Sequence, residues 1–151
     1  PKNSFLAQVL ERRLGIPITL SVLYLEIARR VGVLAQGVSF PGHFLVRVAD
    51  EDSWRFLDPF DGGRLLSTAD LEAILARTAG PGAALAPALL AAANKKQIVS
   101  RMLLNLAGIY GRQGDLVRSL IVLERLAILE PDNPRLAREL ATLRARVDEL
   151  N

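Results

Sequence analysis

The stretch SFPGHFLVRV, Ser39 to Val48, holds the only histidine of the chain. A second stretch, WRFLDPFDGG, follows at residues 54–63. Both place Val, Phe and Leu in short runs that break at proline and glycine, a pattern that predicts strands separated by turns. His43 then opens one strand and Asp58 closes the next. The two stretches therefore raise the question whether an imidazole and a carboxylate meet as parts of a catalytic site.

The surrounding sequence predicts an α+β fold. Three antiparallel strands joined as a meander are expected at residues 35–40, 43–48 and 54–58, and PFDGG at 59–63 is read as a turn cluster. Apolar residues at helical spacing predict helices before and after the strands. These helices are expected at residues 4–13, 17–31, 68–76, 97–111, 116–127 and 134–149.

The composition excludes several kinds of site. The chain has no cysteine, which removes disulfides, thiolate ligands and a cysteine nucleophile, and a single histidine argues against a zinc site. We expect neither a metal nor another cofactor. The net charge of +3 is modest, and the basic pairs lie in helical patterns, so they indicate solvated helix faces and not a nucleic-acid footprint.

The sequence predicts no association with a membrane. The longest apolar run, around LAPALLAAA, is broken by Pro87 and is too short to span a bilayer. No signal peptide is visible, and a cytoplasmic setting is the default expectation. Because the chain starts at Pro1 without a methionine, we expect a segment upstream of it.

The last third of the chain matches a tetratricopeptide unit, a helix–turn–helix of about 34 residues. We expect a core at residues 1–80, a connecting helical segment at 81–96 and this helical tail at 97–151. With Ser100 as its first position, large and small apolar residues, a turn glycine and a terminal proline fall where the repeat needs them. These residues are Leu103, Leu106, Ala107, Tyr110, Gly114, Ser119 and Pro131. A plain helical hairpin that completes a core is the other interpretation of the tail.

The buried helix ending in ARRVGV, the strand opening on histidine and the strand closing on LDP resemble the transglutaminase-like core of papain-like thiol enzymes. More narrowly, GIPITLSVLYLEIARR, PGHFLVRV and the helical tail resemble the bacterial SirB-type transglutaminase-like proteins. The resemblance implies a buried helix packed with an antiparallel three-strand meander, followed by the tetratricopeptide hairpin and a capping helix. It also implies a catalytic triad of cysteine, His43 and Asp58.

The chemistry of such a triad can be stated from the residues. An imidazole titrates near pH ~6.5, so it can take and return a proton at cellular pH. A carboxylate on one ring nitrogen fixes the tautomer and stabilises the imidazolium. The start of a helix offers backbone N–H groups and partial positive charge, which favour a thiolate or an oxyanion.

The nucleophile of the resembled family is missing. Its cysteine would fall within residues 17–19, where Thr19 has the only nucleophilic atom, and internal threonine nucleophiles are uncommon. We expect the neighbouring residues to form a binding site. These are Pro17, Ser21, Phe40, Gly42 and Phe44.

Each candidate also has a purely structural interpretation. His43 would then support a strand, Thr19 would cap its helix, and Asp58 before Pro59 would initiate a turn.

Three functions follow from these residues. The favoured one is a pseudoenzyme, a catalytically degenerate transglutaminase-like module that binds a peptide or protein partner. Such binding could serve regulation. The alternative is a hydrolase or acyl transferase that uses Thr19, His43 and Asp58. The third is a scaffold fragment in which His43 serves stability alone.

Overall fold

The computed structural model describes residues 1–149, which divide into two compact units. The larger unit runs from Lys2 to Ile98, and the smaller one holds Pro1 and the residues from Val99 onward. Among the described residues, no helix combines the length and the apolar character needed to cross a membrane.

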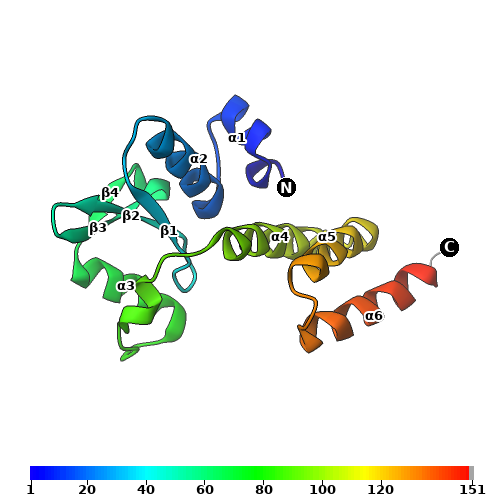
Figure 1. The fold of residues 1–151 in the computed structure, drawn as a ribbon. Helices are drawn as coiled ribbons and strands as arrows, with labels where there is room; N and C mark the ends of the chain where they lie inside the picture. The colour runs from blue at the N-terminus through cyan, green and yellow to red at the C-terminus, as the bar shows by residue number, and fades with distance from the viewer. Residues whose placement is uncertain (150–151) are drawn as a thin grey trace. The chain divides into compact units, whose positions relative to one another are not determined.

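The larger unit has a four-stranded antiparallel sheet in the order β1-β2-β3-β4 (Figure 1). The strands are β1 (Ala35–Val38), β2 (Leu45–Asp50), β3 (Ser53–Asp58) and β4 (Arg64–Leu66). The helices of this unit are α1 (Leu6–Arg12), α2 (Pro17–Arg30) and α3 (Thr68–Ala79), and α4 begins at Lys95. Three short 3-10 helices are η1 (Lys2–Ser4), η2 (Pro59–Asp61) and η3 (Pro87–Leu90).

The meander has one strand more than the sequence predicted. The predicted turn cluster at residues 59–63 consists of η2 and a two-residue turn, and it leads into β4, whose Leu66 pairs with Phe56 of β3. The predicted connecting helical segment at residues 81–96 contains only η3 and the first residues of α4.

Successive side chains of a strand point to opposite faces of its sheet. One face of this sheet packs against α3 and the other against α2. Leu45 and Val38 face α3 and form a buried cluster with its Leu71 and Leu75. On the other face, Gly37 lets the Phe44 ring approach closely, since a Cβ at Gly37 would lie 2.8 Å from Phe44 Cε1 and 3.3 Å from Leu25 Cδ1 of α2. Burial on both faces explains why β1 and β2 contain fully buried residues.

From Val99 to residue 149, the smaller unit consists of helices joined by short turns. It contains most of α4 (Lys95–Arg112), then α5 (Leu116–Leu129) and α6 (Pro134–Asp148). Asp115 caps α5 and Asn133 caps α6 through side-chain hydrogen bonds to backbone N–H groups. The core of this unit consists of leucines, namely Leu123 and Leu126 of α5 with Leu136 and Leu140 of α6.

Candidate functional site

His43 lies at the end of a tight turn and not within a strand. The His43 N–H donates to Phe40 O at 3.0 Å, and Gly42 has φ +68° at the third position of this turn. Proline at the second position and a glycine with positive φ at the third are the signature of a type II turn. The FPGH motif therefore directs the chain back into β2 with the imidazole at the end of the sheet.

This turn is anchored on α3. A Cβ at Gly42 would lie 2.7 Å from Thr78 Cγ2, so only glycine fits both the φ angle and the space. Thr78 Oγ1 lies 3.4 Å from Pro41 O and also donates to Ile74 O at 3.2 Å. No sequence pattern points to Thr78, because it lies 37 residues from Pro41 and belongs to no motif.

Asp58 lies at the end of β3, on the strand that pairs with β2 through Val46 and Leu57. Its Oδ1 accepts a hydrogen bond from the Phe60 N–H at 2.9 Å and so caps η2. Its Oδ2 is 2.7 Å from His43 Nε2. The adjacent strands thus bring together the imidazole and the carboxylate that the sequence singled out.

The pair is sheltered but not closed off. The His43 side chain is 17% exposed and the Asp58 side chain 9% exposed. A carboxylate oxygen can only accept a hydrogen bond, so Nε2 carries the proton and Nδ1 is the acceptor nitrogen of the neutral ring. The Phe60 ring meets the imidazole edge-on, with ring centroids 6.1 Å apart.

The start of α2 lies next to the His43 turn. Ser21 is fully buried, and its hydroxyl donates to the carbonyl of Phe44, the residue after His43, at 3.2 Å. Because a helix makes a turn in about 3.6 residues, Pro17 and Ile18 lie on the same side of α2 as Ser21. The helix face toward the His43 turn therefore begins with two aliphatic residues.

Thr19 points elsewhere. It is two residues before Ser21, about 200° around the helix. Its hydroxyl donates toward Asn3 O and Ile16 O and accepts from the Ile16 N–H, each at 3.0 Å. Among residues 1–149, Thr19 makes no hydrogen bond to His43. The structure therefore brings His43 and Asp58 together but does not bring Thr19 to them.

The five residues expected to form a binding site fall into two groups. Ser21, Phe40 and Phe44 are at most 1% exposed, so they support the site from within the core. Pro17 is half-buried and Gly42 is exposed. Only the latter two have surface that a ligand could touch.

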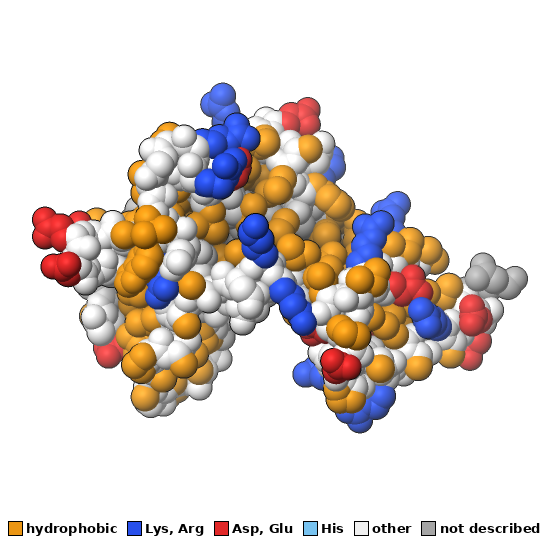
Figure 2. Space-filling model, viewed as in Figure 1, with side chains coloured by type: hydrophobic (Ala, Val, Ile, Leu, Met, Phe, Trp, Pro, Cys, Tyr) orange, Lys and Arg blue, Asp and Glu red, His pale blue; other side chains and the backbone are white. Residues whose placement is uncertain are grey.

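The described residues contain no group of three or more histidine or acidic side chains placed to hold a metal ion. On the face drawn in Figure 2, lysine and arginine side chains are spread among acidic and apolar ones and do not form one continuous patch. Some of the charged groups at the surface form local ion pairs, such as Glu26 with Arg29 and Arg30.

An antiparallel sheet next to the start of a buried helix, with a histidine–aspartate pair at its end, is the arrangement of a transglutaminase-like core. The profile of the Transglutaminase-like superfamily matches residues 1–104. The chain belongs to this superfamily, which confirms the resemblance at that level.

Bacterial and mammalian proteins share this region. A UPF0162 protein of Xylella fastidiosa (strain 9a5c) is 40% identical over 142 residues, covering 92% of this chain and 50% of the relative. A UPF0162 protein of Pseudomonas aeruginosa is 37% identical over 131 residues, covering 87% of this chain and 47% of the relative. The human F-box only protein 21 is 36% identical over 120 residues, covering 74% of this chain and 18% of the relative. The chain thus spans about half the length of these bacterial relatives, and no solved structure matches it.

Proposed function

We propose that the larger unit is a catalytically degenerate transglutaminase-like module that binds a peptide or protein segment at the His43–Asp58 site. The supporting observation is the 2.7 Å pair between His43 Nε2 and Asp58 Oδ2 in a chain without cysteine. A proton-transfer pair is present, but the sulfur nucleophile that it would activate is not. Binding is the function that this combination supports best.

The surroundings of the pair support the same proposal. The start of α2 that faces the His43 turn holds Pro17 and Ile18, which have no nucleophilic atom. The Thr19 hydroxyl is engaged by backbone groups.

The test uses the single histidine as a reporter. The imidazole Cε1–H resonance of His43 is followed by NMR while a blocked glutamine dipeptide is added, and released ammonia is measured in the same samples. We expect a saturable shift of the resonance without release of ammonia. Asp58→Asn, which retains the cap on η2 but changes the imidazole, is expected to weaken the dipeptide binding.

Two results would overturn the proposal. One is steady release of ammonia, or steady hydrolysis of an activated ester, that is lost in both Thr19→Ala and His43→Ala; it would establish the Thr19–His43–Asp58 hydrolase. The other is an unchanged His43 resonance at saturating dipeptide together with loss of folding in His43→Ala, which would leave the histidine a structural residue.

We further propose that the helical unit is a tetratricopeptide repeat of the SirB type, with α6 as its capping helix. The hairpin of α4 and α5, the positive φ of +71° at Gly114 in its turn and the buried Ser119 support this interpretation. Because Ser119 allows the helices to approach, Ser119→Leu is expected to separate α4 from α5 and lower the melting temperature by several degrees. Unchanged melting in this variant would contradict the proposal.

A further inference from the structure

The strand β1 forms one edge of the sheet, and its outer side carries a short run of backbone donors and acceptors. Along an antiparallel strand, the N–H and C=O groups of alternate residues point toward the neighbouring strand and away from it. Leu34 O accepts a hydrogen bond from the Ala49 N–H of β2 at 3.0 Å, so Leu34 points toward β2. The backbone groups of Ala35 and Gly37 therefore point outward. Gly37 O agrees with this direction, because it accepts from the Ala93 N–H at 2.8 Å.

The other three of these outward groups have no hydrogen-bond partner within residues 1–149. They are the N–H and C=O of Ala35 and the N–H of Gly37. Gly37 is buried, and buried backbone N–H groups are almost always hydrogen-bonded. An unpaired donor of this kind, on the edge of a sheet, indicates a place where another strand can add.

A pocket of about 400 Å³ lies along this edge. Its size falls within the range of ligand-binding pockets. The strand β1 forms one wall, Val22 and Leu25 of α2 form the second, and the chain at Ala92 and Ile98 forms the third. The unpaired backbone groups thus lie beside a hollow with mainly aliphatic walls.

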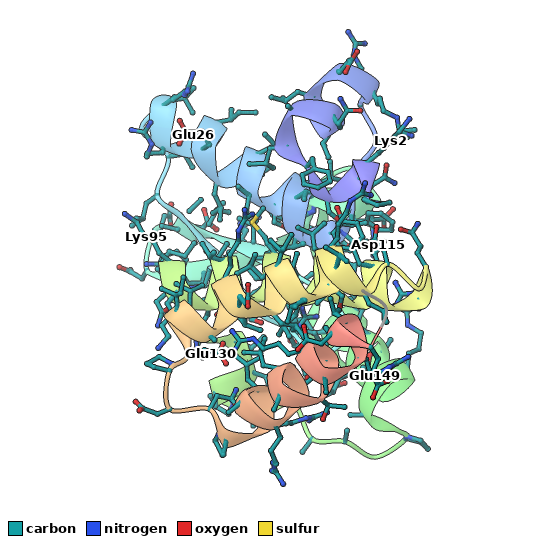
Figure 3. All side chains as sticks on the ribbon, turned by 90° about the vertical axis from the view of Figure 1, so that its right-hand side faces the viewer. Lys2, Glu26, Lys95, Asp115, Glu130 and Glu149 are labelled. Carbon is teal, nitrogen blue, oxygen red and sulfur yellow. The ribbon has the colours of Figure 1, made fainter. Side chains whose placement is uncertain are left out.

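The charges at the pocket cancel. Among the described residues that line it, only Glu26 and Arg29 are charged, and they pair with each other at 2.8 Å. Figure 3 labels Glu26, which lines the pocket from α2, and Lys95, the first residue of α4. Because neither sign of charge is in excess, the pocket favours an uncharged ligand.

We propose that the edge of β1 binds an uncharged, extended peptide segment of a partner protein as an additional parallel strand. One peptide residue lies opposite Gln36, donates its N–H to Ala35 O and accepts a hydrogen bond from the Gly37 N–H. The pairing is parallel because Gly37 O is already bonded to Ala93, so an antiparallel residue opposite Gly37 would leave its own N–H without an acceptor. Main-chain hydrogen bonds supply the affinity of such strand addition.

The side chains of the peptide are selected by the walls of the pocket. The two residues that flank the central one point to the same face as Ala35 and Gly37, because side chains alternate along a strand. Val22 and Leu25 lie on that face, so aliphatic side chains fit there. The site lies before the end of β1 that leads into the FPGH turn, and it is independent of the function proposed for the histidine–aspartate pair.

The experiment follows the Gly37 amide by ¹H–¹⁵N NMR while the peptide Ac-Val-Thr-Val-NH₂ is added to the full chain. We expect a saturable downfield shift of this amide proton, because the N–H gains an acceptor. The same peptide with an N-methyl group on its threonine lacks the N–H that donates to Ala35 O, and it should bind about tenfold more weakly. Ac-Ser-Thr-Ser-NH₂ retains the backbone without the aliphatic side chains and should also bind more weakly.

Two variants of the chain test the pocket itself. Ala92→Trp fills the pocket from an exposed position, so it should abolish binding without lowering the melting temperature. Ala91→Trp is the matched control. It places the same side chain at the neighbouring exposed position, which does not line the pocket, and should bind as the wild type does.

The proposal fails if the Gly37 resonance does not move, if the N-methylated peptide binds as tightly as the parent, or if Ala92→Trp leaves the affinity unchanged. Sedimentation of the same proteins identifies another occupant. A dimer that dissociates in Ala92→Trp but not in Ala91→Trp would show that a second copy of the chain covers the edge of β1, which also contradicts the proposal.

Discussion

Asp58 accepts two hydrogen bonds with its two carboxylate oxygens, from the Phe60 N–H at 2.9 Å and from His43 Nε2 at 2.7 Å. Asparagine can still cap η2 with its oxygen but presents an NH₂ group to the ring. We therefore expect Asp58→Asn to move the proton of the neutral imidazole from Nε2 to Nδ1. Because the chain has one histidine, a long-range ¹H–¹⁵N correlation spectrum shows the tautomer directly. The same tautomer in the wild type and in Asp58→Asn would contradict the hydrogen bond between His43 Nε2 and Asp58.

The geometry of α2 predicts where a nucleophile would face His43. A thiol at position 17 would lie on the side of the helix whose Ser21 reaches Phe44 O. In Pro17→Cys we expect the imidazolium and the helix N-terminus to lower the thiol pKa, and alkylation by iodoacetamide at neutral pH to be several-fold faster than for a free cysteine. The cysteine-free background makes the readout specific.

The matched control for this cysteine removes the histidine. The double variant Pro17→Cys with His43→Gln should lose most of the rate advantage. Equal rates with and without His43 would show that position 17 does not face the imidazole.

At the scale of elements, the FPGH turn depends on its contact with α3. We expect Gly42→Ala to lower the free energy of unfolding by about 1–3 kcal/mol from backbone strain alone, and by more because its Cβ would lie 2.7 Å from Thr78 Cγ2. Urea denaturation measures this. Gly63→Ala is the control, since Gly63 has φ +79° but open space around its Cβ. Equal losses in the two variants would show that contact with α3 adds nothing.

The first turn of α3 is stabilised by a carboxylate. Ser67 and Arg64 donate to Asp70, and these hydrogen bonds hold the Asp70 pKa far below its ordinary value. A lowered pKa in the folded state contributes stability above the ordinary carboxyl pKa and loses it as the pH falls below that range. We therefore expect the stability difference between the wild type and Asp70→Asn to shrink between about pH 5 and pH 2.

Denaturant titrations at several pH values measure that difference. Glu72→Gln is the control, because it removes a carboxylate from the same helix without breaking a hydrogen bond or ion pair of the described chain. A constant difference across the acid range would contradict the role of Asp70.

The elements that sequence reasoning found are those with local signals. Apolar periodicity located α2, and proline with glycine located the turn before His43. The strand β4 was not predicted, because the three residues that follow PFDGG are too few to show an alternation of apolar and polar side chains. Only their pairing with β3 makes them a strand. The structural interpretation of Thr19 as a helix cap agrees with its hydrogen bonds to the Ile16 backbone, whereas its hydrogen bond to Asn3 O joins residues 16 apart and carries no sequence signal.

At the scale of the whole molecule, residues 1–149 include two hydrophobic clusters made of different residues. One joins Val38, Phe40 and Leu45 of the sheet region to α3, and the other is the leucine core of α5 and α6. The superfamily match covers residues 1–104, so it includes all of the first core and none of the second.

The two cores should respond separately to cavities. Leu75→Ala and Leu126→Ala each truncate a side chain that is 2% exposed, and each should cost about 2–5 kcal/mol. Because the cores share no residue, we expect faster amide hydrogen exchange in β2 and α3 for Leu75→Ala, and in α5 and α6 for Leu126→Ala. Mass spectrometry of proteolytic peptides locates the change. Ile128→Ala, at a position 80% exposed, should alter neither unit. Loss of protection throughout the chain in both leucine variants would mean that the chain unfolds as one cooperative unit.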